Sequence, residues 1–300
     1  MPIIKRRGDL NMRISCSVRL CALFALPLCL AGQVRADEPE IEFKSDVEYG
    51  TGGDQKLTLH LALQKTDGAR PGLVFIHGGG WAAGKKDDLK DAIREAAGKG
   101  YVAISVGYRL APQNPFPAQV EDVKCAVRWM RAHADEIKLD SKRIGAIGFS
   151  AGAHLSMMLG VMDRDDGLEG SGGWADQPSK VQAVVAYFGP VDLLGEYPPV
   201  SQEIVAKFIG GTKAEKTAEY RRASPITYVS SGDAPMLLFQ GTNDVLVPFD
   251  QAYLMARALT EAKVPGRVEL LLGSGHGWGG QDLDHTRNDT YEFFSRWLKK

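Results

Sequence analysis

The chain has 300 residues, of which 44% are hydrophobic and 24% are charged, and its formal net charge at pH 7 is −1. This composition is typical of globular domains and excludes a chain that is mainly disordered. A net charge so close to zero does not build the basic field on which nucleic-acid binding depends, so we expect no nucleic-acid partner.

The first 36 residues differ in charge from the rest. They carry six basic residues against one acidic residue, whereas the remaining 264 carry 30 basic against 36 acidic ones. An apolar run over residues 20–31 is too short to span a bilayer as a helix. Val34 and Ala36 then offer small residues before a cleavage point. We therefore expect a signal peptide over residues 1–36, with Met12 as an alternative start and an uncleaved anchor as the alternative interpretation. The predicted product is exported, periplasmic or extracellular, with no stable membrane insertion.

Strand-like and helix-like segments alternate along residues 37–300. Short apolar or alternating runs predict seven strands, at 56–64, 73–77, 102–106, 144–149, 181–188, 236–240 and 268–272. Helical patterns lie between them, at 87–97, 117–135, 151–162, 250–262 and 285–298. Such alternation predicts a single α/β domain with a mostly parallel central sheet and helices on both faces.

Two longer segments interrupt this alternation. Residues 163–179 are polar and turn-rich, and residues 190–233 contain Pro198, Pro199 and a helical stretch near 201–208. Insertions in α/β folds usually lie above the carboxyl ends of the strands, where ligands bind. We expect both segments there, with about 190–233 forming a small insertion over the site. Because these segments have few long apolar runs, they favour short acyl groups over lipid chains.

Residues 148–152, Gly-Phe-Ser-Ala-Gly, have the pattern of a nucleophile elbow. They follow an apolar run and precede a helical pattern that starts at Ala151, which is the strand–turn–helix context of that motif. The two glycines leave room for a sharp turn that exposes the serine hydroxyl above the sheet. The pattern predicts Ser150 as a catalytic nucleophile.

A serine nucleophile needs a base and a carboxylate that orients the base. His276 lies in a glycine-rich loop directly after the last predicted strand and is well placed to reach Ser150; His285 is the alternative. Asp244 follows the strand at 236–240, whereas its rival Asp250 is better suited to cap the next helix. The chain order Ser150, Asp244, His276 is that of the α/β-hydrolases.

A glycine run follows the strand at 73–77. Consecutive glycines let backbone N–H groups point at a developing oxyanion, so we expect the amides of Gly79, Gly80 and Ala151 to form an oxyanion hole. Phosphate binding is the alternative, but no Walker lysine motif follows the run. The chain contains neither an HExxH motif nor clustered CxxC pairs, so we expect no metal.

Three tryptophans lie in loops that we expect near the mouth of the site. Trp81 and Trp278 are candidate substrate-binding residues, since an exposed indole can stack on a sugar or a feruloyl ring. Trp174 is likewise expected in a loop near the mouth of the site. Burial against the loops is the alternative for each ring.

Several motifs together resemble those of α/β-hydrolase esterases, in particular hormone-sensitive-lipase-like enzymes and secreted bacterial feruloyl or acetylxylan esterases. They are His77-Gly-Gly-Gly-Trp81, Gly107-Tyr-Arg-Leu-Ala-Pro112, Gly148-Phe-Ser-Ala-Gly152, Asp244-Val-Leu-Val-Pro248 and His276-Gly277. The resemblance implies a carboxylic ester hydrolase without a metal or organic cofactor. Lipase-like relatives carry a long helical cap before the glycine motif. Here only about 40 residues separate the predicted signal from His77, and this short segment favours the polysaccharide-esterase-like subgroup.

The combined prediction is a secreted serine carboxylesterase that acts on short-acyl, acetyl-type or feruloyl esters. The substrate would be a small molecule or linked to a plant polysaccharide. A peptidase or amidase of the same fold, and a binding module without catalytic activity, are the alternatives.

Overall fold

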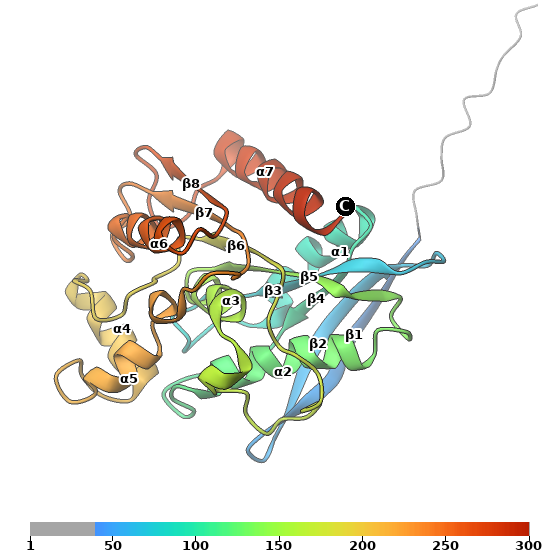
Figure 1. Ribbon diagram of the computed structural model, residues 1–300, viewed down its shortest axis with the longest axis horizontal. Coiled ribbons are helices and arrows are strands. Elements are labelled where there is room, and N and C mark those ends of the chain that lie inside the picture. The colour runs from blue at the N-terminus through green and yellow to red at the C-terminus, as the bar shows by residue number, and fades with distance from the viewer. Residues whose placement is uncertain (1–39, 300) are drawn as a thin grey trace, which may run out of the picture. The chain divides into compact units, whose positions relative to one another are not determined.

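A computed structural model describes residues 40–299, so the predicted signal peptide lies outside the described residues. Its eight-stranded sheet has the order β1-β2-β4-β3-β5-β6-β7-β8 (Figure 1). The strands are β1 (Ile41–Gly52), β2 (Gln55–Gln64), β3 (Arg70–Ile76), β4 (Val102–Val106), β5 (Leu139–Phe149), β6 (Ala183–Tyr187), β7 (Met236–Gly241) and β8 (Gly266–Leu271). The β1–β2 and β2–β4 pairs are antiparallel and all other neighbours are parallel. The predicted mostly parallel sheet is confirmed.

Helices cover both faces of this sheet (Figure 1). On one face, α1 (Lys90–Gly98) and α7 (Gly280–Leu298) bury side chains such as Ile93 and Phe294. On the other face lie α2 (Ala118–Ala132), α3 (Ala151–Val161) and α6 (Asp250–Glu261). Every residue of α3 is buried, which explains why its sequence is apolar on all sides.

The sequence patterns missed two elements and placed the starts of β5 and α7 five residues too late. β1 is an edge strand whose pairing with β2 shifts register between Lys44 and Val47, and this irregularity breaks the two-residue alternation by which strands are recognised. The short helix α5 (Thr217–Arg222) has too few residues for a helical period to show. α7 begins at Gly280, five residues before the predicted start, because its first turn is polar.

The insertion at about 190–233 lies over the carboxyl ends of the parallel strands, as expected. It contains α4 (Pro199–Ile209) and α5, which appear at the left of Figure 1. Ser201 of α4 donates a hydrogen bond to the carbonyl of Leu246 in the loop after β7 (2.8 Å). At the other end of α4, the carbonyl of Phe208 accepts from the amide of Phe116 (2.7 Å). These contacts fix α4 above the sheet edge.

Residues 163–179 lie elsewhere, which corrects the expectation that they cover the site. The carboxylate of Glu169 accepts from Lys124 (2.7 Å) and Arg128 (2.8 Å), both buried cations of α2. The carbonyl of Gly172 accepts from the amide of Thr51 in β1 (3.0 Å). Because buried cations need a partner of opposite charge, the segment is held against α2 and β1.

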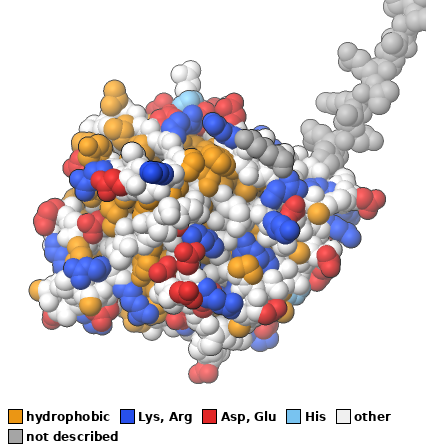
Figure 2. Space-filling view, viewed as in Figure 1, with side chains coloured by type: hydrophobic (Ala, Val, Ile, Leu, Met, Phe, Trp, Pro, Cys, Tyr) orange, Lys and Arg blue, Asp and Glu red, His pale blue; other side chains and the backbone are white. Residues whose placement is uncertain are grey.

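The surface carries both signs of charge. On the face shown in Figure 2, Lys and Arg side chains are interspersed with Asp and Glu. This distribution agrees with a formal net charge of −1. Within residues 40–299, no helix combines the length and the hydrophobicity needed to cross a bilayer.

Candidate active site

Ser150 occupies a strained turn between β5 and α3. Its φ of 54° and ψ of −118° are rarely adopted by residues with a side chain. A Cβ added to Gly148 would lie 2.1 Å from the carbonyl oxygen of Gly152, and one added to Gly152 would lie 2.1 Å from that of Ile76. Only glycine therefore fits at both positions, and the resulting turn exposes Ser150 to a cavity.

His276 and Asp244 continue a line of hydrogen bonds that starts at Ser150. Nε2 of His276 lies 2.9 Å from Oγ of Ser150, and its Nδ1 lies 2.8 Å from Oδ2 of Asp244. An ionised carboxylate only accepts hydrogen bonds, so Nδ1 carries the proton and Nε2 is free to accept from the serine hydroxyl. The three side chains come from loops that follow β5, β7 and β8, and they match a nucleophile, a general base and an orienting carboxylate.

The carboxylate of Asp244 is fully buried and accepts hydrogen bonds at both oxygens. Oδ1 accepts from the amides of Leu246 (2.8 Å) and Val247 (2.9 Å), and Oδ2 accepts from Nε2 of Gln240 (2.9 Å) as well as from His276. Burial by itself raises the pKa of Asp244, but the hydrogen bonds from His276, Val247 and Leu246 outweigh it and hold the pKa below its ordinary value. Asp244 therefore stays ionised beside the imidazole.

The sequence patterns did not predict that Gln240 contacts Asp244. Gln240 lies near the end of β7 and is 1% exposed. One signal in the sequence could have revealed this contact, because Gln240 is a polar residue at the end of an otherwise apolar strand. Buried polar groups almost always have a hydrogen-bonding partner.

Gly79, Gly80 and Ala151 line the same cavity as Ser150. Gly79 and Gly80 have φ of 108° and 58°, and a Cβ on Gly79 would lie 2.3 Å from the carbonyl oxygen of Ala83. Within residues 40–299, neither glycine amide donates to another protein group. The amide of Ala151 belongs to the first turn of α3, where helical N–H groups have no partner within the helix. Three N–H groups are therefore available to an oxyanion.

The backbone that leads into this glycine run is fixed by His77 and Tyr108. The Tyr108 hydroxyl donates to the carbonyl of His77 (3.0 Å), and the two rings stack with centroids 4.2 Å apart. Nδ1 of His77 donates to the carbonyl of Gly78 (2.8 Å). Burial lowers the pKa of His77, so its ring is neutral and acts as packing beneath the loop.

A cavity of about 480 Å³ opens beside Ser150 and has mainly apolar walls. The larger apolar and aromatic side chains in these walls are Trp81, Phe149, Phe188, Tyr197, Ile204, Val205, Leu246 and Val247, and Lys207 also lines the cavity. Ile204 and Val205 belong to α4, so the insertion supplies an apolar face that its loop-like composition did not predict.

Trp81 lines the cavity but is itself 3% exposed. Its ring stacks on Phe208 of α4 with centroids 4.2 Å apart, and its indole N–H donates to Nδ1 of His154 (3.2 Å). Nε2 of His154 donates to the carbonyl of Ala223 (2.6 Å), and burial lowers the pKa of His154 to about 4, so Nδ1 is an unprotonated acceptor. Trp81 is therefore a fixed part of the wall.

The other two tryptophans do not line the cavity, which corrects both expectations. The indole N–H of Trp278 donates to Oγ1 of Thr286 (3.0 Å), and its ring packs edge-on against Phe188. Trp278 thus supports a wall residue from behind. Trp174 donates to the carbonyl of Tyr49 (2.8 Å), because residues 163–179 pack against β1.

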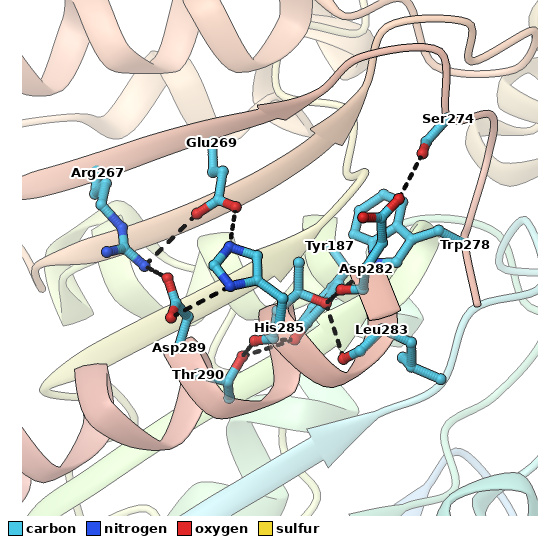
Figure 3. A network of polar contacts seen from close by, with 11 residues as sticks. Tyr187, Arg267, Glu269, Ser274, Trp278, Asp282, Leu283, His285, Asp289 and Thr290 are labelled. Atoms are coloured by element: carbon cyan, nitrogen blue, oxygen red, sulfur yellow. Dashed lines mark hydrogen bonds and ion pairs between the residues drawn. The ribbon is translucent and has the colours of Figure 1, made fainter. Parts of the chain in front are cut away.

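The alternative base and the alternative acid also lie apart from Ser150. Nε2 of His285 lies 2.6 Å from Oε1 of Glu269, and the imidazole is 55% exposed on α7 (Figure 3). Asp250 is the first residue of α6 and makes no capping hydrogen bond, so its expected role as a cap is wrong. Neither residue lines the cavity.

One group in the described part of the chain has the composition of a metal site. Glu269, His285 and Asp289 each offer a potential ligand atom within 4.8 Å of the others. The guanidinium of Arg267 pairs with Asp289 and lies 3.8 Å from Glu269 (Figure 3). Since this cation already pairs with both carboxylates, the group fits a salt-bridge network better than a cation site.

A family model described as BD-FAE matches residues 58–259. This chain belongs to the BD-FAE family. It is also similar to two Mycobacterium tuberculosis (strain ATCC 25618 / H37Rv) proteins, esterase LipC and the probable carboxylic ester hydrolase LipM. Both are 31% identical to it, over 77% and 68% of this chain and over 59% and 48% of the relatives. The chain thus spans about half the length of these curated relatives.

Solved structures extend the similarity over most of the described chain. A truncated carbohydrate esterase from gut microbiota aligns with a TM-score of 0.76 and 27% identity, covering 88% of this chain and 99% of that one. Esterase Est2 of Thermogutta terrifontis aligns with a TM-score of 0.70 and 27% identity, covering 87% and 94%. The BD-FAE chain therefore has the α/β-hydrolase fold, and the resemblance to esterases of that fold is confirmed.

Proposed function

We propose that this BD-FAE protein is a serine carboxylesterase. The observation that carries the proposal is the hydrogen-bonded line from Ser150 through His276 to Asp244, at the wall of an apolar cavity. The esterases to which the chain is similar support the same class of reaction.

In the proposed reaction, Oγ of Ser150 attacks the ester carbonyl carbon while Nε2 of His276 takes the hydroxyl proton. The carbonyl oxygen becomes an oxyanion and accepts from the amides of Gly79, Gly80 and Ala151. His276 gives its proton to the departing alcohol as the ester C–O bond breaks and an acyl-serine remains. Water then attacks the carbonyl carbon of this acyl group while His276 takes a proton from the water. The bond between the acyl carbon and Oγ breaks, His276 returns the proton to Oγ of Ser150, and the carboxylic acid leaves.

We propose short acyl groups, acetyl-type or feruloyl, carried by small alcohols or by plant polysaccharides. Structures of Thermogutta terrifontis Est2 are described as propionate-bound and butyrate-bound, and another similar structure is of a carbohydrate esterase. Endo-1,4-beta-xylanase B of Butyrivibrio fibrisolvens is 28% identical over 86% of this chain and 38% of its own length. Export to the periplasm or the medium is part of this proposal and rests on the charge and apolar patterning of residues 1–36.

Hydrolysis of 4-nitrophenyl acetate by the wild type and by Ser150→Ala tests the proposal. Loss of a triad nucleophile costs about 10⁴ to 10⁶ in kcat, while the exposed Ser295→Ala control keeps its activity. The acetanilide analogue separates an esterase from an amidase, since the amide should react far more slowly. Retention of more than about a tenth of the wild-type rate in Ser150→Ala contradicts the assignment.

A further inference from the structure

The wall of the active-site cavity carries one side chain with a permanent charge. Among the described residues that line it, Lys207 is the only Lys or Arg, and no Asp or Glu lines it. The other polar groups there are neutral hydroxyls, glycine amides and the imidazole of His276. The lining of this cavity therefore includes one positive charge and no carboxylate.

Lys207 has no partner of opposite charge in residues 40–299. Two other lysines are paired, since Lys213 of the same insertion lies 3.4 Å from Glu196 and Lys180 lies 2.7 Å from both Asp163 and Asp233. Within residues 40–299, Lys216 of the insertion, like Lys207, forms no ion pair. An ammonium without an ion pair keeps its full capacity to bind an incoming anion.

The backbone of Lys207 is held in place by the buried residues next to it. Phe208 is fully buried and stacks on Trp81 of the cavity wall, and Ile209 is 1% exposed. α4 then ends at Gly210, whose φ of 81° is a left-handed conformation that stops the helix. The lysine stem thus starts from a fixed point at the cavity, and Lys207 as a whole is exposed.

We propose that Lys207 binds a carboxylate of the substrate and makes anionic esters the preferred class. This inference rests on the proposed ester hydrolysis. The carboxylate would belong either to the acyl part, as in a monoester of a dicarboxylic acid, or to the alcohol part, as in an acetylated uronic acid. A purely structural role is the competing account, because a lysine in the last turn of a helix also stabilises the helix dipole.

The test measures the ratio of kcat/KM for an anionic ester to that for its neutral counterpart. One pair is mono-4-nitrophenyl glutarate and 4-nitrophenyl valerate, and the other is acetylated glucuronic acid and acetylated glucose. For the substrate pair whose carboxylate Lys207 binds, we expect this ratio to fall about 5- to 20-fold in Lys207→Gln. The ratio should fall further in Lys207→Glu. Lys207→Arg should restore much of it, and added salt should lower the wild-type ratio.

Lys213→Gln is the matched control, since Lys213 lies in the same insertion but does not line this cavity. Its ratio should equal that of the wild type. The inference is overturned if Lys207→Gln and Lys207→Glu keep wild-type melting temperatures and the ratio is unchanged for both substrate pairs. That result leaves the esterase proposal intact. A wild type that hydrolyses none of the four esters overturns both.

Discussion

The side-chain amide of Gln240 donates to Oδ2 of Asp244 at 2.9 Å, and the same oxygen accepts from Nδ1 of His276 at 2.8 Å. Nε2 of Gln240 also donates to the carbonyl of Val247 (3.0 Å), in the loop whose amides bind Oδ1. Because Gln240 is buried at the end of β7, it joins a rigid strand to the carboxylate. We infer that Gln240 positions Asp244 toward the imidazole.

Gln240→Ala removes one donor from this carboxylate. A hydrogen bond to a charged group contributes about 1.5 to 3 kcal/mol, so we expect kcat to fall by about tenfold or more while KM stays nearly unchanged. Steady-state kinetics on 4-nitrophenyl acetate measure both constants. The exposed Gln281→Ala serves as control. Unchanged kcat in a folded Gln240→Ala variant would show that the amide has no part in positioning Asp244.

Two histidine variants test which imidazole is the base. His276→Ala should lose about 10⁴ to 10⁶ in kcat, because no group remains to accept the proton of Ser150. His285→Ala should retain activity within about twofold, since its imidazole contacts Glu269 and Asp289 rather than the cavity. If His285→Ala were inactive and His276→Ala active, the assignment of the base would be wrong.

The contact between His285 and Glu269 predicts a pH-dependent contribution to stability. The hydrogen bond from His285 to Glu269 and their charge attraction raise the pKa of His285 in the folded protein. The contact therefore stabilises the fold fully below the unfolded pKa of about 6.5, and this contribution is lost as the pH rises through the higher folded pKa. The melting temperatures of the wild type and His285→Gln should differ more at about pH 5.5 than at about pH 9. An equal or larger difference at the alkaline pH would contradict this sign.

The positions of the site residues were predictable because each follows a parallel strand. Ser150 comes directly after β5, Asp244 follows β7, and His276 follows β8. The carboxyl ends of parallel strands meet at one edge of a sheet, so residues far apart in the chain converge there. The glycines around Ser150 added a local steric signal that required no knowledge of the tertiary structure.

The directions of loop side chains were not predictable in this way. Trp278 turns away from the cavity because its indole N–H reaches Thr286 of α7. Residues 163–179 lie away from the site because Glu169 pairs with buried Lys124 and Arg128 of α2. Such partners lie far apart in the sequence, and neither hydrophobic periodicity nor turn composition reveals them.

The proposed preference for short acyl groups is tested by varying the length of the acyl chain. Trp81 is held by Phe208 and His154, so it forms a fixed part of the wall of this cavity, which has a volume of about 480 Å³. Each buried CH₂ contributes about 0.8 kcal/mol only while it remains inside apolar walls. Rates on 4-nitrophenyl esters of increasing length should peak between acetyl and butyryl, without activation by lipid interfaces. A peak at about eight carbons or more would contradict this prediction.

Covalent capture of the nucleophile tests the central claim most directly. The wild type and Ser150→Ala are treated with a fluorophosphonate, and the modified residue is located by intact-mass measurement and peptide sequencing. The account predicts one adduct per chain, on Ser150, with loss of ester hydrolysis in proportion to labelling and no adduct on Ser150→Ala. An adduct on another residue, or full ester hydrolysis by a chain fully labelled at Ser150, would contradict it.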